Sequence, residues 1–206
     1  MLSSPAAQVQ EAIRQRWQDG GPERIIRVRM SREDFFALPH IEQKTEWRDG
    51  WALIMDAARP DHGRILLRIG ALLLAALPTC DAIAEPGIAT ERSNREPDIG
   101  VFRRKVQNPP KGSYGYTNDI PLIAIEIISP STRQEDMIFK AAEYAVKGVE
   151  QYWIVDPVFY SLTVFTNAGG YWDEGSRVEL DCDNPVGEIQ VSEVGIVPID
   201  LRELFA

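Results

Sequence analysis

The sequence has few residues of the types that build disulfide frameworks or metal–thiolate sites. It contains only two cysteines and two histidines among 206 residues. Cys80 and Cys182 cannot make a disulfide framework, and His40 and His62 give no zinc-type spacing with them. These shortages exclude a disulfide-stapled module and a zinc finger, and they favour a reducing compartment.

Several short motifs and segment types are also missing from the sequence. There is no glycine-rich phosphate-binding loop and no nucleophile elbow. The most apolar helical stretch, residues 65–77, is interrupted by Arg68 and is too short to span a bilayer. The first residues have no basic region followed by an apolar one, so we expect no signal peptide and a cytoplasmic protein.

The charge is acidic overall but unevenly placed. The net charge is −9, and nine acids against two bases lie in residues 173–206. Residues 92–111 instead hold six bases and two acids, which suits either a solvated loop or a phosphate-facing loop beside a site. The acidic total argues against a protein that only neutralises phosphates, but it does not exclude an enzyme.

The pattern of elements predicts an α/β fold with a mixed central β-sheet flanked by helices. Residues 1–24, a weak helix followed by Gly20-Gly21-Pro22, are predicted to be an N-terminal helical appendage to a domain over residues 25–206. Asp49-Gly50 between two apolar runs predicts a hairpin. Thr132-x-x-Glu135 predicts a capping box at the start of a helix that runs to about Lys147. The other main elements are expected as helices beginning at Ser31 and over 61–77, and as strands over 97–102, 121–128, 151–156, 161–166 and 196–201.

Three charged residues in this pattern could carry chemistry. Glu126 interrupts an apolar strand, where a carboxylate is costly unless it is paired, hydrogen-bonded or bound to a metal. Asp98 lies on a second strand, and Lys140 lies on the helix after the Glu126 strand. The plainer alternatives are an ion-paired strand-end Glu126, a turn aspartate at 98, and an i,i+4 pair of Lys140 with Asp136.

Two acids on neighbouring strands could hold a hard divalent cation. Mg²⁺ fits, because it accepts one or two carboxylates together with waters and a substrate phosphate. Glu46, at the start of the hairpin, and His62, at the start of the next helix, are candidates for a third ligand or a proton shuttle. Their plainer readings are a surface acid and a structural histidine.

A longer set of motifs resembles a known family. The set comprises Glu96-Pro97-Asp98-Ile99, the run from Ala124 through Glu126 and Ser129-Pro130-Ser131-Thr132, the spacing Asp136-x-x-x-Lys140-x-x-x-Tyr144, and Gly148-Val149-x-x-Tyr152-Trp153-Ile154-Val155-Asp156-Pro157. Together they resemble the Uma-type family of restriction endonucleases, within the PD-(D/E)xK nuclease superfamily. The resemblance covers roughly residues 25–205, and Glu46 and His62 also fit its pattern.

This resemblance implies a restriction-endonuclease-like fold and an Mg²⁺-dependent endonuclease, with Mn²⁺ as a substitute and nucleic acid, DNA in the first place, as substrate. It implies catalytic roles for Glu46, Asp98, Glu126 and Lys140, and metal binding by Asp98, Glu126 and the Ile127 carbonyl. The superfamily pattern would place its lysine at 128, where this chain has Ile128, so Lys140 stands in for it.

Two other functions stay open at this point. One is a catalytically inactive binding or interaction module that keeps the nuclease fold, and the other is a structural protein in which Glu126 is only ion-paired. A homodimer would suit an enzyme that cuts both strands.

Overall fold

The structure is a computed structural model that describes residues 4–19, 25–56, 59–103, 116–130 and 132–206. Its centre is a six-stranded mixed sheet with the strand order β12-β11-β10-β9-β7-β4, here called the central sheet. β9 and β10 pair in parallel, and the other neighbours are antiparallel. Its strands are β4 (Cys80–Ala84), β7 (Ile99–Arg103), β9 (Ile123–Ile127), β10 (Gln151–Asp156), β11 (Ser161–Asn167) and β12 (Trp172–Leu180). The predicted α/β class with a mixed sheet is confirmed.

A second six-stranded sheet, the N-terminal sheet, has the order β1-β3-β2-β6-β5-β8. The predicted hairpin lies in it: Asp49 and Gly50 have φ angles of 47° and 86°, a conformation that suits a tight two-residue turn. Its strands are β1 (Ile26–Arg29), β2 (Thr45–Arg48), β3 (Trp51–Ile54), β5 (Gly87–Ala89), β6 (Ser93–Arg95) and β8 (Tyr116–Thr117).

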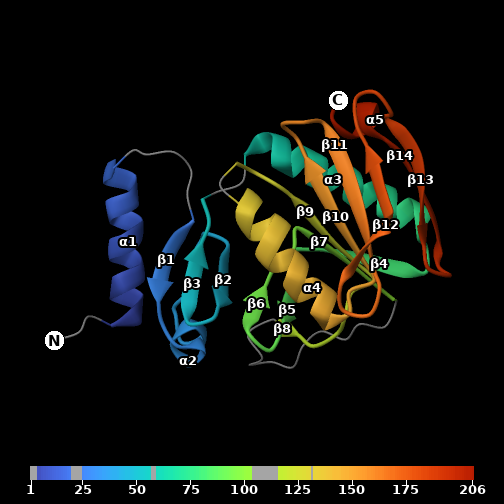
Figure 1. Ribbon diagram of the computed structural model, residues 1–206. Coiled ribbons are helices and arrows are strands. Elements are labelled where there is room, and N and C mark those ends of the chain that lie inside the picture. The colour runs from blue at the N-terminus through green and yellow to red at the C-terminus, as the bar shows by residue number, and fades with distance from the viewer. Residues whose placement is uncertain (1–3, 20–24, 57–58, 104–115, 131) are drawn as a thin grey trace.

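Helices cover both faces of the central sheet (Figure 1). α3 (Pro60–Ala76) packs on one face through Ile65, Ile69 and Leu73. The other face carries α4 (Ala141–Lys147), preceded by a π-helix, η1 (Glu135–Lys140). The hairpin of β13 (Val186–Val191) and β14 (Gly195–Asp200) joins the core on the α3 side, and α5 (Leu201–Leu204) follows it.

The N-terminal helix α1 (Pro5–Asp19) lies beside the N-terminal sheet in Figure 1. Its Val9 is buried in a cluster with Val28, Phe35 and Ile54. α2 (Arg32–Phe36) begins after Ser31, whose hydroxyl accepts a hydrogen bond from the Asp34 amide, as the sequence predicts. The division into residues 1–24 and 25–206 stays a prediction, and residues 20–24 lie outside the described residues.

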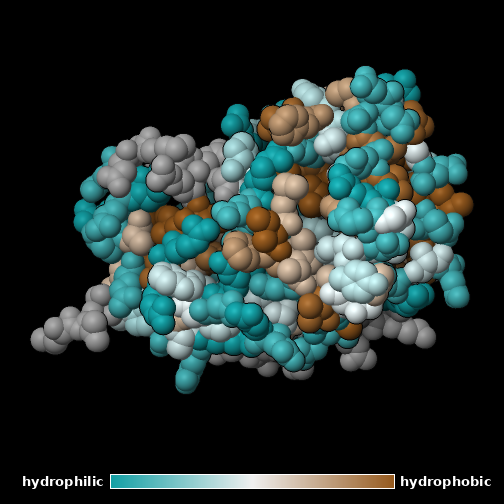
Figure 2. All heavy atoms as spheres, viewed as in Figure 1, coloured by the Kyte–Doolittle hydropathy of each residue, from teal (hydrophilic) through white to brown (hydrophobic). Residues whose placement is uncertain are grey.

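Two surface properties complete the description of the fold. Within the described ranges, none of the helices has the length and apolarity to cross a membrane. Figure 2 shows mostly hydrophilic spheres on the visible face, with hydrophobic groups near the start of the α4 helix and at the top, over the β10–β11 turn. The exposed apolar residues of these two places are Met137, Ile138, Phe139, Val158 and Phe159.

The alternation of β9 determines where its carboxylate points. Ile123, Ile125 and Ile127 enter the core under α3, whereas Ala124 and Ile128 pack against α4. Because successive side chains in a strand point to opposite faces, Glu126 lies on the α4 face. The single acid of this apolar strand therefore faces the helix that carries Lys140.

Candidate active site

Asp98 lies directly before β7, next to the end of β9, and both of its oxygens are held. One oxygen, Oδ2, accepts a hydrogen bond of 2.7 Å from the Ile127 amide. The other, Oδ1, accepts one of 2.8 Å from Lys44 Nζ and lies 3.5 Å from His62 Nε2. Since the N–H and C=O of one strand residue face the same neighbouring strand, the Ile127 carbonyl also lies on the Asp98 side.

Glu126 is buried, and one of its carboxylate oxygens accepts two hydrogen bonds. Its Oε1 accepts hydrogen bonds from Lys140 Nζ at 3.0 Å and from Tyr144 Oη at 3.2 Å. Tyr144 and Lys140 reach it together because they stand one turn apart on the same helical face. Lys140, on the helix after the Glu126 strand, thus reaches the carboxylate of that strand.

Lys140 is the meeting point of three carboxylates. Besides Glu126, its Nζ lies 3.0 Å from Asp136 Oδ1 and 3.1 Å from Glu46 Oε1. Glu46 is fully buried and accepts two further hydrogen bonds, from the Glu96 amide at 3.0 Å and from Arg95 at 3.0 Å. Glu46, a residue of the N-terminal sheet, therefore contacts Lys140 from the side of that sheet.

The π-helix determines which of its residues face this cluster. The Ala141 amide bonds back to the Asp136 carbonyl, an i→i+5 bond that widens the turn. Glu135, Asp136 and Lys140 are consequently all buried, while the three apolar residues between them, 137–139, are exposed. Tyr152 Oη supports the widened turn by donating a 2.9 Å hydrogen bond to the same Asp136 carbonyl.

The predicted capping box at Thr132 and Glu135 is wrong. The Thr132 hydroxyl contacts Ser129, and the Glu135 carboxylate accepts hydrogen bonds from Arg48 at 2.6 Å and Arg95 at 2.9 Å. Two guanidinium groups, that of the fully buried Arg95 and that of the partly buried Arg48, therefore hold Glu135 in place of the single backbone amide that a capping box would offer, because ionised donors bind a carboxylate with charge on both sides of the hydrogen bond.

A cavity of about 350 Å³ opens over these residues. It lies between the start of α3, the end of β9 and the start of η1, and Pro157 and Val158 of the β10–β11 turn form part of its wall. The predicted residues that line it are His62, Asp98, Glu126, Ile127 and Lys140. Glu46 is absent from this lining, which also includes Lys44 and Asp136.

The pKa values of Asp98 and Glu126 are shifted in opposite directions. Burial would raise the pKa of Asp98, but the charge of Lys44 and the hydrogen bond from His62 hold it well below its usual range. Burial raises the pKa of Glu126 well above its ordinary value, despite the opposing charge of Lys140. Burial also raises the pKa of Asp136, which competes with Glu126 for Lys140.

These residues meet the requirements of a hard divalent cation that keeps several waters. Three carboxyl groups of the cavity, Asp98, Glu126 and Asp136, contact only two lysines, and a bound cation would favour the ionised forms of Glu126 and Asp136. The buried Asp136 Oδ1 lies beside Lys140 without an aligned hydrogen bond. Over the described part of the chain, no group of three or more His, Cys, Asp or Glu is arranged to enclose a metal. Mg²⁺ needs only one or two protein carboxylates, so the donor set fits it.

In the basic segment 92–111, Arg92 and Arg103 are exposed, as a solvated segment predicts, whereas Arg95 differs from both predictions. Arg95 is fully buried in β6 and bonds to Glu46, Glu135 and Glu143 rather than facing solvent or a ligand. Arg92 pairs with Asp49 at the surface. Arg104, Lys105 and Lys111 lie outside the described residues.

Sequence reasoning missed two residues that matter here. Lys44 stands two positions before Glu46, and this period-two spacing is the signal that could have placed both on one side of the hairpin. In the sequence Arg95 is one base of a charged segment, and no local pattern distinguishes it from its exposed neighbours.

Glu96, beside this cluster, gives a prediction for stability. Burial raises its pKa from 4.5 to about 7, although Tyr116 Oη donates a 2.9 Å hydrogen bond to it. The folded state therefore holds a proton that the unfolded chain releases, and stability falls as pH rises from about 4.5 to about 7. We expect Glu96→Gln to raise the free energy of unfolding at pH 8 by on the order of 1 to 3 kcal/mol.

The measurement is urea unfolding of both proteins at pH 8 and at pH 5. The advantage of Glu96→Gln should shrink towards zero at pH 5, where folded Glu96 is already neutral. An equal advantage at both pH values would contradict the assignment.

Comparisons with known proteins give the family and the fold of the chain. The chain matches the model of the Uma2 family, described as "Putative restriction endonuclease", over residues 32–186. It is similar to a solved structure described as "a putative nuclease belonging to DUF820" from Anabaena variabilis ATCC 29413. The TM-score is 0.67 at 19% identity, and the match covers 84% of this chain and 96% of that one. At this identity the likeness shows the fold. No curated protein matches the chain.

Proposed function

Since the chain belongs to the Uma2 family, we propose that it is an Mg²⁺-dependent endonuclease that hydrolyses phosphodiester bonds in DNA. The observation that carries the proposal is the cavity in which Asp98, directly before β7, and Glu126, on the adjacent β9, face Lys44 and Lys140. Several carboxyl groups together suit a cation, and the paired lysines beside them suit a phosphate that this cation holds.

Asp98, Glu126 and the Ile127 carbonyl would hold the ion. When bound, Mg²⁺ supplies Lewis-acid polarisation of the scissile phosphate and a nucleophile from water at neutral pH. The water oxygen forms a bond to phosphorus while one P–O ester bond breaks, leaving a phosphate monoester and a hydroxyl.

The chain's own residues position and stabilise this reaction. Lys140 is held at the cavity by Glu46 and Asp136, and its ammonium stabilises the negative charge that develops on the phosphoryl oxygens. Lys44 and the Ile127 amide fix the two oxygens of Asp98. On these contacts, Glu46 acts by orienting Lys140.

The direct test is cleavage of supercoiled plasmid by the purified protein. We expect nicked and linear products with Mg²⁺ or Mn²⁺ and none with excess EDTA, because the ion is part of the reaction. No cleavage with either ion would contradict the proposal.

Calorimetry separates the enzyme from the inactive module. Metal binding that is lost in Glu126→Gln supports the site, and binding without cleavage favours an interaction module with the same fold. No metal binding at all favours a structural Glu126. A homodimer and a cytoplasmic location stay predictions.

A further inference from the structure

The turn between β10 and β11 holds an aromatic ring in an exposed position. The residue Phe159 is 66% exposed, yet its backbone is fixed. The Asp156 carboxylate accepts hydrogen bonds from the Val158 amide at 2.9 Å and the Phe159 amide at 3.2 Å. The turn therefore presents this ring in a defined place without packing it into the core.

A cation lies against the same ring. The guanidinium carbon of Arg133 lies 5.3 Å from the centroid of the Phe159 ring, and Arg133 also bonds to Asp156. One carboxylate thus positions both the turn and the arginine. Arg133 covers one side of the ring, and most of the residue stays open to solvent.

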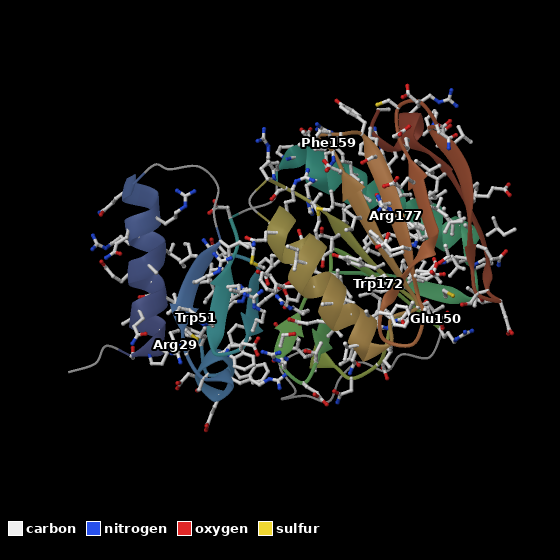
Figure 3. The ribbon with its side chains drawn as sticks, in the orientation of Figure 1. Arg29, Trp51, Glu150, Phe159, Trp172 and Arg177 are labelled. Carbon is white, nitrogen blue, oxygen red and sulfur yellow. The ribbon has the colours of Figure 1, made fainter. Side chains whose placement is uncertain are left out.

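This ring stands at the edge of the candidate active site. Pro157 and Val158, the two residues before it, line the cavity that contains Asp98 and Glu126. Figure 3 labels Phe159 at the top of the molecule, where the ends of the strands meet the start of α3. A polymer that left the cavity past Pro157 and Val158 would therefore reach the ring.

The charges around the cavity leave little affinity for phosphates alone. Lys44, Lys140 and Arg133 each already face a carboxylate. The chain carries a net charge of −9. Since nonspecific affinity for nucleic acid comes from bases that neutralise phosphates, another source of binding energy is needed. Stacking of a base on an aromatic ring supplies such binding energy, and every base can stack in this way.

We propose that Phe159, backed by Arg133, is a base-stacking platform, and that the substrate strand carries an unpaired nucleotide beside the scissile phosphate. The inference rests on the proposed nuclease function and names its substrate class. In an intact duplex both faces of a base are stacked on its neighbours, so only an unpaired or displaced base offers a face to Phe159. The preferred substrate is therefore single-stranded or locally unpaired nucleic acid.

The test measures binding by fluorescence anisotropy in EDTA, with a short labelled thymidine oligonucleotide, its duplex and its abasic analogue. The proteins are the wild type, Phe159→Ala, Phe159→Trp and Tyr171→Ala. The last is a matched control, because Tyr171 is 65% exposed on the β11–β12 turn, away from the cavity. We expect Phe159→Ala to weaken binding of the thymidine strand about five-fold or more. Phe159→Trp should keep binding, and Tyr171→Ala should not change it.

The duplex and the abasic strand identify stacking as the cause. Phe159→Ala should bind the duplex as wild type does, and it should also bind the abasic strand as wild type does. In Mg²⁺, Phe159→Ala should lose cleavage of the single strand only. Equal binding of the thymidine strand by both proteins, or an equal loss on all three ligands, overturns the platform. If wild type cleaves while Phe159→Ala matches it, only this inference fails. If wild type neither cleaves nor binds nucleic acid, the proposed function fails with it.

Discussion

Asp98→Asn is expected to lower DNA cleavage by at least about 10³-fold while the protein stays folded. The substitution keeps an oxygen for the Ile127 amide but removes the negative charge that the ion needs. A metal supplies several kcal/mol of transition-state stabilisation, and each 1.36 kcal/mol is a factor of ten in rate. The measurement is the initial rate of plasmid nicking in Mg²⁺.

Binding should respond in the opposite direction to cleavage in this variant. Asp98 neutralises Lys44 across 2.8 Å, so its removal frees one positive charge at the cavity. We expect Asp98→Asn to bind uncleaved DNA in EDTA as well as or better than wild type. This separates a catalytic defect from a misfolded protein, in which binding and cleavage fall together.

Glu188→Gln on β13 is the matched control, because it removes an exposed carboxylate outside the cavity lining. It should cleave like wild type. If Asp98→Asn retains cleavage within ten-fold of this control, the assignment of Asp98 is wrong.

Arg95→Met is expected to cost about 3 to 5 kcal/mol of unfolding free energy, the usual loss when one partner of a buried ion pair is removed. Arg95 is 0% exposed and lies 3.0 Å from Glu46, 2.9 Å from Glu135 and 2.7 Å from Glu143. Without the charge of Arg95, these three carboxylates lose the cation that they share. For a chain of this size the melting temperature should fall by roughly 6 to 20 °C.

The control for Arg95 is its neighbour Arg92, whose pair with Asp49 is exposed. Arg92→Met should change stability by less than about 1 kcal/mol, since exposed pairs contribute little. Adding Glu135→Gln and Glu143→Gln to Arg95→Met should restore part of the loss, because the uncompensated charges are then gone. Thermal melts of the four proteins check this, and a variant Arg95→Met as stable as Arg92→Met would contradict it.

The sequence was sufficient for the elements whose signals are local. Asp49-Gly50 predicts its turn because only residues that tolerate positive φ fit there. The apolar run around Glu126 predicts a buried strand, and alternation then places its carboxylate opposite Lys140. Gly148 likewise ends α4 in the left-handed conformation.

The interactions that the sequence did not reveal depend on partners far along the chain. Glu135 resembles a helix-capping acid until Arg48 and Arg95, from two other strands, approach it. Arg95 resembles a surface base until β6, a strand of the N-terminal sheet, buries it against Glu135 of η1 and Glu143 of α4. Long-range charge pairing decides both positions, and local periodicity carries no information about it. The roles of the cavity residues stay predictions.

The widened turn of η1 affects how relatives of this chain can be compared. An i→i+5 turn takes up one more residue than an α-helical turn, and α4 follows η1 without a break. A homologue could therefore lack one of the exposed residues 137–139 and still present its lysine to the strand acid. Alignments that require a fixed interval between Glu126 and Lys140 would misplace the lysine in such a homologue. The interval is better treated as a gap of variable length than as part of the motif.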